Sequence, residues 1–150
     1  MENDNIYIKE LDKKIITFLK KHHVMTLATA ENNIPWCCTC FYVFDEKTIK
    51  FFVTSDHKTR HVKEVLMQPM VSGVVALETT MVGKIQGIQF SGIMNELGED
   101  EYSNTRKIYI KRFPVASLVK LQLWSIIPDF IKFTDNRLGF GKKMIWQRKS

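Results

Sequence analysis

Three apolar runs follow one another closely in the first third of the sequence. They read VMTLATA (residues 24–30), IPWCCTCFYVF (34–44) and TIKFFVT (48–54), and only ENN and DEK separate them. Runs rich in β-branched and aromatic residues are typical of strands, and asparagine tolerates the left-handed backbone of a tight turn. Strands joined by such short turns pair with each other in antiparallel fashion, because a parallel crossover needs a dozen or more residues. This part of the chain is therefore predicted to form a meander, which favours an antiparallel sheet or barrel.

The other predicted elements are a few helices and further strands. Apolar residues recur at helical spacing between residues 8 and 19, which predicts an amphipathic helix. Further helices are predicted at residues 58–67 and 100–111, and further strands at 71–77, 84–97, 123–128, 130–135 and 139–147. No regular alternation of strand and helix supports a parallel sheet. The fold class is therefore predicted as α+β, a single domain over residues 1–150 with an antiparallel six- to seven-stranded barrel and two or three flanking helices.

A cluster of basic residues, SDHKTRH (residues 55–61), lies where the third strand of the meander is followed by a helix. It contains Lys58, Arg60, His57 and His61. A solvated basic loop is one interpretation. An anion site is the other, because the unpaired N–H groups and the dipole of a helix N-terminus already favour an anion. Cations in the first turn oppose that dipole, so they are easier to explain if a negatively charged group binds beside them.

The three cysteines, Cys37, Cys38 and Cys40, lie very close together in the sequence. Their odd number and close spacing argue against a disulfide framework. Zinc sites use ligand pairs such as C-x-x-C with a second pair elsewhere, and CCTC provides neither, so no metal is predicted. No histidine lies nearby in the sequence to activate a thiol as a nucleophile. The cysteines are therefore predicted to be small buried hydrophobic residues.

The chain carries a formal net charge of +6, which would suit either a nucleic acid or an anionic ligand. No helix-turn-helix, zinc-finger or ribonucleoprotein pattern accompanies this charge, and most aromatic residues alternate like core residues, so nucleic-acid binding is not expected. No apolar run has the length of a membrane span, and the N-terminal residues lack the cationic and apolar regions of a leader. A cytoplasmic protein without a membrane segment is expected.

The order of these segments resembles the FMN-binding split β-barrel proteins typified by pyridoxamine 5′-phosphate oxidase. The stretch LATAENNIPWCCTCFYVFDEKTIKFFVTSDHKTRHVKEVLMQPMVSGVV (residues 27–75) contains a strand with LAT, a strand that begins at a proline, a strand that ends in TS, and a basic turn before a helix. The later IQGIQFSGIM is similar to the long strand of the same fold. Within the family, the KTRH turn and the stretch WSIIPDFIKFTDN resemble the YhbP-like branch.

This resemblance implies a homodimer with one FMN at each of two sites along the subunit interface. The family holds the phosphate at the end of the third strand and in the following turn, and it holds the ring against the second strand, largely through main-chain groups. These roles fall on Thr54, Ser55, Lys58, Thr59 and Arg60 for the phosphate, on Trp36, Cys37, Cys38 and Thr39 for the ring, and on Gln86 or Gln89 beside the cofactor. Strand alternation puts Cys37 and Thr39 on one face and Cys38 and Cys40 on the other, and the sequence leaves open which face meets the flavin.

The activity that the resemblance implies is that of an FMN-dependent oxidoreductase acting on a small-molecule substrate. FMN would pass hydride or electrons between a reduced donor and a small acceptor, while the protein binds and orients it. No catalytic side chain is assigned. Two alternatives use the same scaffold: a non-catalytic haem-binding protein, with His22, His23, His57 and His61 as the candidate ligands, and a protein that binds another cofactor such as a deazaflavin.

Overall fold

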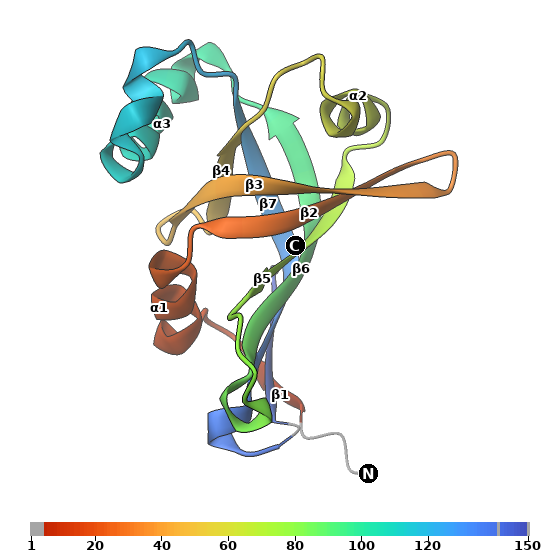
Figure 1. Cartoon of the computed structure of the whole chain (residues 1–150), viewed down its shortest axis with the longest axis vertical. Helices are drawn as coiled ribbons and strands as arrows, with labels where there is room; N and C mark the ends of the chain where they lie inside the picture. Colours follow the sequence, from red (N-terminus) through yellow and green to blue (C-terminus); the bar gives the residue numbers. More distant parts are fainter. Residues whose placement is uncertain (1–4, 141, 150) are drawn as a thin grey trace.

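The computed structural model describes residues 5–140 and 142–149 of the chain (Figure 1). The strands are β1 (Asn5–Ile8), β2 (Val24–Glu31), β3 (Ile34–Asp45), β4 (Lys50–Thr54), β5 (Met70–Ala76), β6 (Gln86–Glu96), β7 (Leu123–Asp135) and β8 (Lys143–Gln147). The α-helices are α1 (Lys13–Lys21), α2 (Arg60–Met67) and α3 (Glu99–Arg112), and short 3₁₀ helices are η1 (Val82–Lys84), η2 (Pro114–Leu118) and η3 (Asn136–Leu138). None of the described helices combines the length and the hydropathy that a membrane crossing requires.

Six strands close into a barrel because β7 has pairing partners on both of its edges. The sheet order is β1-β8-β7-β4-β3-β2-β5-β6, and β6 in turn pairs with β7. One edge of β7 pairs with β6 over residues 124–135, whereas the other pairs first with β4 and then with β8. All pairings within the ring are antiparallel, and β1 joins the outer edge of β8 in parallel. The predicted α+β split barrel is confirmed, and β8 and β1 extend its sheet beyond β7.

The β2–β3 hairpin ends in a turn made by Asn32 and Asn33. Both residues have positive φ, at 50° and 63°, and the flanking Glu31 and Ile34 pair directly. Two residues of positive φ between paired strands are typical of a type I′ turn, whose twist matches that of the strands. The hairpin projects beyond the rest of the barrel on the right of Figure 1. Its tip and α2 together border a cleft.

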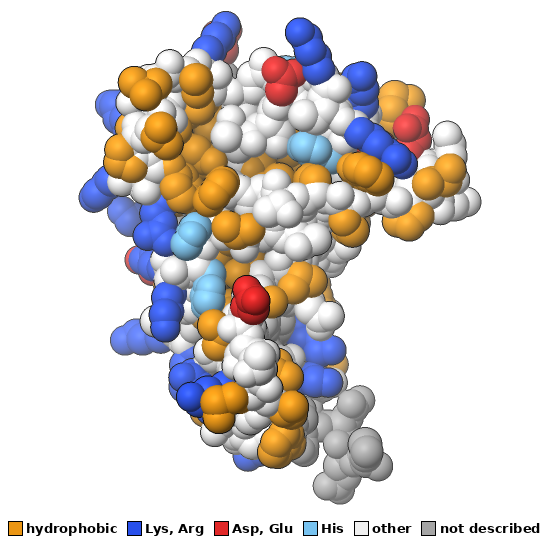
Figure 2. Space-filling model, in the orientation of Figure 1, with side chains coloured by type: hydrophobic (Ala, Val, Ile, Leu, Met, Phe, Trp, Pro, Cys, Tyr) orange, Lys and Arg blue, Asp and Glu red, His pale blue; other side chains and the backbone are white. Residues whose placement is uncertain are grey.

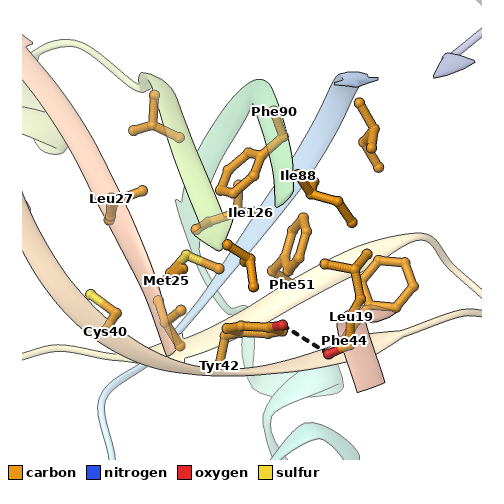
Figure 3. Packing of buried hydrophobic residues seen from close by; sticks show 14 of the residues in the cluster. Leu19, Met25, Leu27, Cys40, Tyr42, Phe44, Phe51, Ile88, Phe90 and Ile126 are labelled. Carbon is orange, nitrogen blue, oxygen red and sulfur yellow. Dashed lines mark hydrogen bonds between the residues drawn. The ribbon is translucent and has the colours of Figure 1, made fainter. Parts of the chain in front are cut away.

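The main core fills the barrel and the space between the barrel and α1 (Figure 3). Alternate residues of each strand point inward, as Met25 and Leu27 of β2 illustrate. The Tyr42 hydroxyl donates a hydrogen bond to the Leu19 carbonyl oxygen at 2.8 Å, which joins β3 to the end of α1. Burial of this much apolar surface is the dominant favourable contribution to folding. A smaller cluster lies under α3 and contains Tyr109, Leu121 and Leu123.

The helix predicted over residues 8–19 is wrong at its start. Asp12 caps α1, because its carboxylate accepts a hydrogen bond from the Lys14 backbone N–H at 2.7 Å, and the helix covers Lys13–Lys21. Residues before the cap form β1, which the sequence does not predict. β1 exists because β8 has an available edge, and Ile8 pairs there with Trp146.

The two strands predicted at residues 123–128 and 130–135 are a single strand, β7. Pro128 suggests a break because proline cannot donate to a sheet. A bulge accommodates it: Gly92 pairs with Pro128 and Ser91 with Phe130, which leaves Asp129 as the extra residue on β7. The last predicted strand, residues 139–147, is present as β8 from Lys143 onward, and Gly141 lies outside the described residues.

The bulge makes Gly92 intolerant of a side chain. A Cβ at this position would overlap the Ile127 carbonyl oxygen and lie 2.7 Å from the Pro128 Cα. We expect Gly92→Ala to destabilise the fold by about 1–3 kcal/mol, as overpacking typically does, and to lower the midpoint of urea unfolding. Gly83→Ala is the matched control, because no described atom lies within 4 Å of a Cβ there. Equal midpoints for the two variants would contradict the prediction.

Candidate functional site

The SDHKTRH turn (residues 55–61) is organised by Asp56. The Asp56 carboxylate accepts a hydrogen bond from the Lys58 backbone N–H at 2.7 Å, and the Asp56 carbonyl oxygen accepts one from the Thr59 hydroxyl at 2.7 Å. Thr59 is the N-cap residue of α2, but its side chain makes no capping hydrogen bond to the helix. Its hydroxyl therefore bonds back into the turn. The backbone N–H groups at the start of α2 remain open to an anion.

His57 anchors the turn to the barrel. Its Nε2 lies 2.8 Å from the Glu96 carboxylate, and its Nδ1 lies 2.8 Å from Oε1 of Gln122. The hydrogen bond with Glu96 raises the pKa of His57 above its ordinary value. Both ring nitrogens are thus engaged by protein groups, and the centroids of the His57 and Trp124 rings are 5.3 Å apart. His57 is a structural member of the basic cluster.

Arg60 is paired with a buried carboxylate on its own helix. Its Nε donates to Oε1 of Glu64 at 2.7 Å, and its guanidinium lies 4.2 Å from the centroid of the Trp36 ring. The Glu64 side chain is only 4% exposed, and its other oxygen accepts a hydrogen bond from the Thr29 hydroxyl. The hydrogen bonds from Thr29 and Arg60 lower the pKa of Glu64. Arg60 therefore has an internal counter-ion, and the expectation that a cation in the first turn needs an external anion is wrong for this residue.

A cleft of about 380 Å³ opens between α2 and the tip of the β2–β3 hairpin. Its lining residues are Glu31, Asn32, Ile34, Lys58, Arg60, Lys63 and Glu64. Lys58 and Lys63 are exposed, and neither forms an ion pair with another described residue. Figure 2 shows Lys and Arg side chains gathered over α2 and beside the hairpin. Three cations against two carboxylates, together with the helix dipole, make this cleft attractive to an anion.

The burial of its side chains shows which face of β3 points outward. Cys37 and Thr39 are exposed, whereas Cys38 is half-buried and Cys40 is buried. The face that carries Cys37 and Thr39 is therefore the outer one. The prediction that the cysteines are buried hydrophobic residues is wrong for Cys37, because the barrel encloses only one of the two faces of β3.

The outward side chains of β3, β2, β5 and β6 form a continuous surface, which we call the outer sheet face. Thr39, Thr26, Val74 and Gln89 stand side by side across these four strands. Apolar side chains that are 38–55% exposed accompany them, namely Val24, Phe41, Met70, Val74 and Ile93. Water contact with this much apolar side chain is unfavourable, so the surface is suited to covering by another molecule.

The first half of β3 has one edge without a strand partner. β3 pairs with β2 from Ile34 to Phe41, but it pairs with β4 only from Tyr42 to Asp45. Alternate main-chain N–H and C=O groups of residues 34–41 therefore point away from β2 and meet no strand among the described residues. Trp36, under the Arg60 guanidinium, lies on this part of β3. The unpaired edge and the cation-lined cleft are thus adjacent.

Gln86 lies in a different region from Gln89. Its side-chain amide donates to Oδ2 of Asp135 at 2.8 Å, and the same oxygen accepts from the Arg137 guanidinium at 2.8 Å. With lysines of α1, these residues line a second cleft of about 320 Å³. Only Gln89 of the two predicted glutamines shares the outer sheet face with Cys37 and Thr39.

Two cysteines on the inner side of β3 meet a histidine from α2. The Sγ atoms of Cys38 and Cys40 lie 3.7 Å apart, and with a ring nitrogen of His61 they form a set of three atoms within 4.8 Å of one another. His61 Nε2 lies 2.9 Å from the Ser55 Oγ. The hydrogen bond between the thiols lowers the pKa of Cys40, and the same bond together with burial raises that of Cys38. Sequence analysis finds no histidine near the cysteines, because His61 follows two elements later.

The predicted site residues thus fall into separate groups. Trp36, Lys58 and Arg60 lie together around the α2 cleft. Thr54 and Ser55 are half-buried at the end of β4, and Thr59 is the N-cap residue of α2. The outer sheet face carries Cys37, Thr39 and Gln89, whereas Cys38 faces inward. Gln86 lines the second cleft. Two residues of the cleft, Lys63 and Glu64, are not among those predicted from the sequence. Their spacing of three and four residues from Arg60 on a predicted helix is the signal that would have found them.

The chain is similar in sequence to bacterial proteins along most of its length. It is 43% identical to the UPF0306 protein YhbP of Escherichia coli O157:H7 over 136 residues, which cover 91% of this chain and 92% of that protein. It is also 43% identical to a UPF0306 protein of Klebsiella pneumoniae (strain 342) over 131 residues, which cover 87% of this chain and 89% of that protein. No protein-family model matches the chain.

Solved structures with the same fold have low sequence identity to the chain. A heme binding protein from Mycobacterium smegmatis superposes with a TM-score of 0.74 at 13% identity, over 93% of this chain and 60% of that one. A FAD-binding protein from Mesorhizobium loti superposes with a TM-score of 0.66 at 13% identity, over 81% of this chain and 92% of that one. A putative pyridoxamine 5′-phosphate oxidase from Listeria innocua superposes with a TM-score of 0.66 at 17% identity, over 83% of this chain and 98% of that one. At such identities the similarity shows the fold, which is the split barrel of the pyridoxamine 5′-phosphate oxidase-like proteins.

The buried carboxylate of Glu64 should make the fold sensitive to acid. Because its folded-state pKa is lowered from the ordinary value of 4.5, Glu64 contributes stability that is fully present above that pH and is lost as the pH falls through the folded-state pKa. We expect the free energy of unfolding of wild type to exceed that of Glu64→Gln near neutral pH, and this difference in free energy to shrink below about pH 4.5. Urea unfolding at a series of pH values measures it.

Glu31→Gln is the matched control for this series, since it removes an exposed carboxylate from the same cleft. The difference between wild type and Glu31→Gln should stay small at every pH. A difference between wild type and Glu64→Gln that is constant down to about pH 3 would contradict the role given to the Glu64 carboxylate.

Proposed function

The chain belongs to the UPF0306 family of YhbP-like proteins and has the pyridoxamine 5′-phosphate oxidase-like split-barrel fold. We propose that it is an FMN-binding oxidoreductase that acts as a homodimer. The observation that carries the proposal is the adjacency of two features. A cation-lined cleft lies at the N-terminus of α2, and beside it β3 has a main-chain edge without a strand partner. A ligand with an anionic end and a polar heterocyclic end matches both.

The α2 cleft suits the phosphate of FMN. A phosphate monoester carries about −1.5 to −2 charges at neutral pH. Lys58 and Lys63 supply charge, and the N–H groups of Arg60 that Glu64 does not use supply directed donors. Because Glu64 and Trp36 already hold the Arg60 side chain, little side-chain entropy is lost when the anion binds. Thr54, Ser55 and Thr59, at the end of β4 and the start of α2, remain part of the proposed phosphate site.

The free edge of β3 suits the flavin ring. Ring oxygens and nitrogens can exchange hydrogen bonds with main-chain groups of residues 36–39, which satisfies groups that β4 does not reach. Cys37 and Thr39 are the side chains on the outer face of this segment, and Gln89 is the glutamine of that face. Cys38 would contribute main-chain groups only, because its side chain faces inward.

The outer sheet face suits a second copy of the chain. Its exposed apolar side chains surround a row of small or uncharged residues, so two such faces can approach without burying a like-charged pair. A partner subunit there would also cover the ring site on β3. This is the arrangement of the proposed homodimer, in which the cofactor lies along the subunit interface.

Bound FMN would supply the redox chemistry, by accepting and returning hydride or electrons. The side chains described here bind and orient it, and none is assigned as a catalytic acid or base. The proposed substrates are a reduced donor and a small acceptor. A cytoplasmic location belongs to the same proposal, because all three cysteines are free thiols, as is usual in that reducing compartment.

Haem is the alternative cofactor, since the fold also occurs in a heme binding protein. His23 favours this alternative among the histidines, because it is exposed beside Phe41 at the rim of the outer sheet face, with the two ring centroids 6.0 Å apart. His57 does not, because both of its ring nitrogens are engaged. A Soret band in the visible spectrum of the purified protein would favour haem, and flavin bands with release of FMN on denaturation would favour the flavoprotein.

The phosphate assignment predicts that affinity depends on Lys58. A hydrogen bond to a charged group contributes about 1.5–3 kcal/mol, so Lys58→Ala should weaken FMN binding roughly tenfold to a hundredfold. Riboflavin, which lacks the phosphate, should bind the variant and wild type alike. Quenching of flavin fluorescence measures both affinities. Lys47→Ala, an exposed lysine between β3 and β4, is the matched control. Equal affinity of wild type for FMN and riboflavin would reject the assignment.

The homodimer predicts that a charge at Thr26 is disruptive. Thr26 is exposed near the middle of the outer sheet face, so Thr26→Lys would bring two like charges into the interface, at a cost of roughly several kcal/mol. Sedimentation should show a dimer for wild type and a monomer for Thr26→Lys, and FMN binding should weaken at least about tenfold. Ser103→Lys, on an exposed position of α3, is the control and should remain dimeric. A monomeric wild type would reject the proposed interface.

A further inference from the structure

We propose that Cys38, Cys40 and His61 form a binding site for a thiophilic transition-metal ion, with Zn²⁺ as the reference ion. The two thiols come from the inner side of β3, and the imidazole comes from the first turn of α2. Two cysteines and one histidine are a common donor set for zinc, in which a fourth position is left to water or another ligand. The FMN proposal does not enter this inference, because it uses none of the three donor side chains.

The spacing of the donor atoms matches tetrahedral coordination. Two sulfur atoms that each lie about 2.3 Å from a zinc ion, at the tetrahedral angle, are about 3.8 Å apart. The Cys38 and Cys40 sulfurs are 3.7 Å apart. The ring nitrogen of His61 belongs to the same set, whose members all lie within 4.8 Å of one another. The two sulfurs are thus already spaced for one ion, and the imidazole nitrogen lies close enough to be its third ligand.

The strand geometry favours an ion over a disulfide between these thiols. Cys38 and Cys40 are two residues apart on one strand, so their Cα atoms are separated by roughly 6.6–6.8 Å. This is the upper limit of the distances that disulfides span, and such bonds are strained and easily reduced. A metal ion bridges the same two sulfurs without strain, because it accepts the separation that the strand imposes.

The surroundings of the cluster provide support on one side and access on the other. Cys40 is buried in the core and is thereby held in place, whereas Cys38 and His61 are half-buried and leave a route for an ion. The Ser55 hydroxyl lies 2.9 Å from Nε2 of His61. This hydrogen bond fixes the orientation of the imidazole beside the two thiols. An ion bound here would link the first turn of α2 to β3.

The test is a metal titration of the full chain after treatment with a chelator, in a non-chelating reductant. Co²⁺ reports directly on the donors, since a tetrahedral thiolate site gives sulfur-to-cobalt charge-transfer bands. We expect one Co²⁺ per chain with these bands, displacement by Zn²⁺, and release of about two protons as the thiols ionise. Saturating Zn²⁺ should also raise the thermal unfolding midpoint.

Substitutions test whether the metal ion binds at this cluster. Cys38→Ser and His61→Asn should each weaken Zn²⁺ binding by well over about tenfold, since even an outer-shell partner of a metal ligand can contribute that much. Cys37→Ser is the matched control for the thiol, because Cys37 is adjacent in sequence but faces outward, and His23→Asn is the control for the imidazole. Both controls should bind as wild type does.

Three outcomes would overturn the proposal. One is a cobalt spectrum without thiolate bands, which would mean that other residues bind the ion. Another is equal weakening by Cys37→Ser and Cys38→Ser. The third is unchanged Zn²⁺ binding in Cys38→Ser. Circular dichroism and the urea midpoint of this variant check that any weakening of Zn²⁺ binding is not caused by loss of folding.

Discussion

The fold depends on β7, because this strand pairs with both ends of the run β4-β3-β2-β5-β6. A run of strands closes into a barrel when its two end strands pair with a common strand, and here β4 and β6 pair with opposite edges of β7. The bulge at Ser91 and Gly92 allows Pro128 to lie inside that strand. Because β4 occupies only the first part of one edge of β7, β8 pairs with the rest of that edge, and β1 pairs with β8.

The shortness of β4 also creates the candidate site. β4 pairs with only the second half of β3, so the first half projects with β2 as a hairpin that has one open edge. α2 follows β4 directly and packs against this hairpin, where Glu64 of α2 meets Thr29 of β2 and Arg60 stacks on Trp36. A buried carboxylate is costly unless it is paired, so these contacts define the position of α2. The cleft and the open edge become neighbours as a result.

The proposed metal ion and the proposed flavin ring lie on opposite faces of the same half-strand, whereas Trp36, beside the phosphate cleft, is on the face of Cys38 and Cys40. Alternation along β3 directs Cys37 and Thr39 toward the proposed flavin and partner subunit, and it directs Cys38 and Cys40 toward His61. Both proposals involve the first turn of α2, which carries Arg60 and His61 in succession. An ion bound to His61 would restrict the motion of the turn from which Arg60 reaches the cleft. Binding at one site is therefore expected to reduce local unfolding at the other.

Local signals in the sequence predict the meander, the asparagine turn at residues 32–33 and the basic turn before α2, and their order carries the family resemblance. Those signals were sufficient for the barrel and for the placement of Lys58 and Arg60. Three features depend on contacts between distant parts of the chain: the strand at residues 5–8, the pairing of Arg60 with a Glu64 carboxylate that also bonds Thr29, and the approach of His61 to Cys38 and Cys40. The physical reason is that strand periodicity groups side chains by face, whereas the long-range pairing of β7 decides which face is interior and which distant elements meet there.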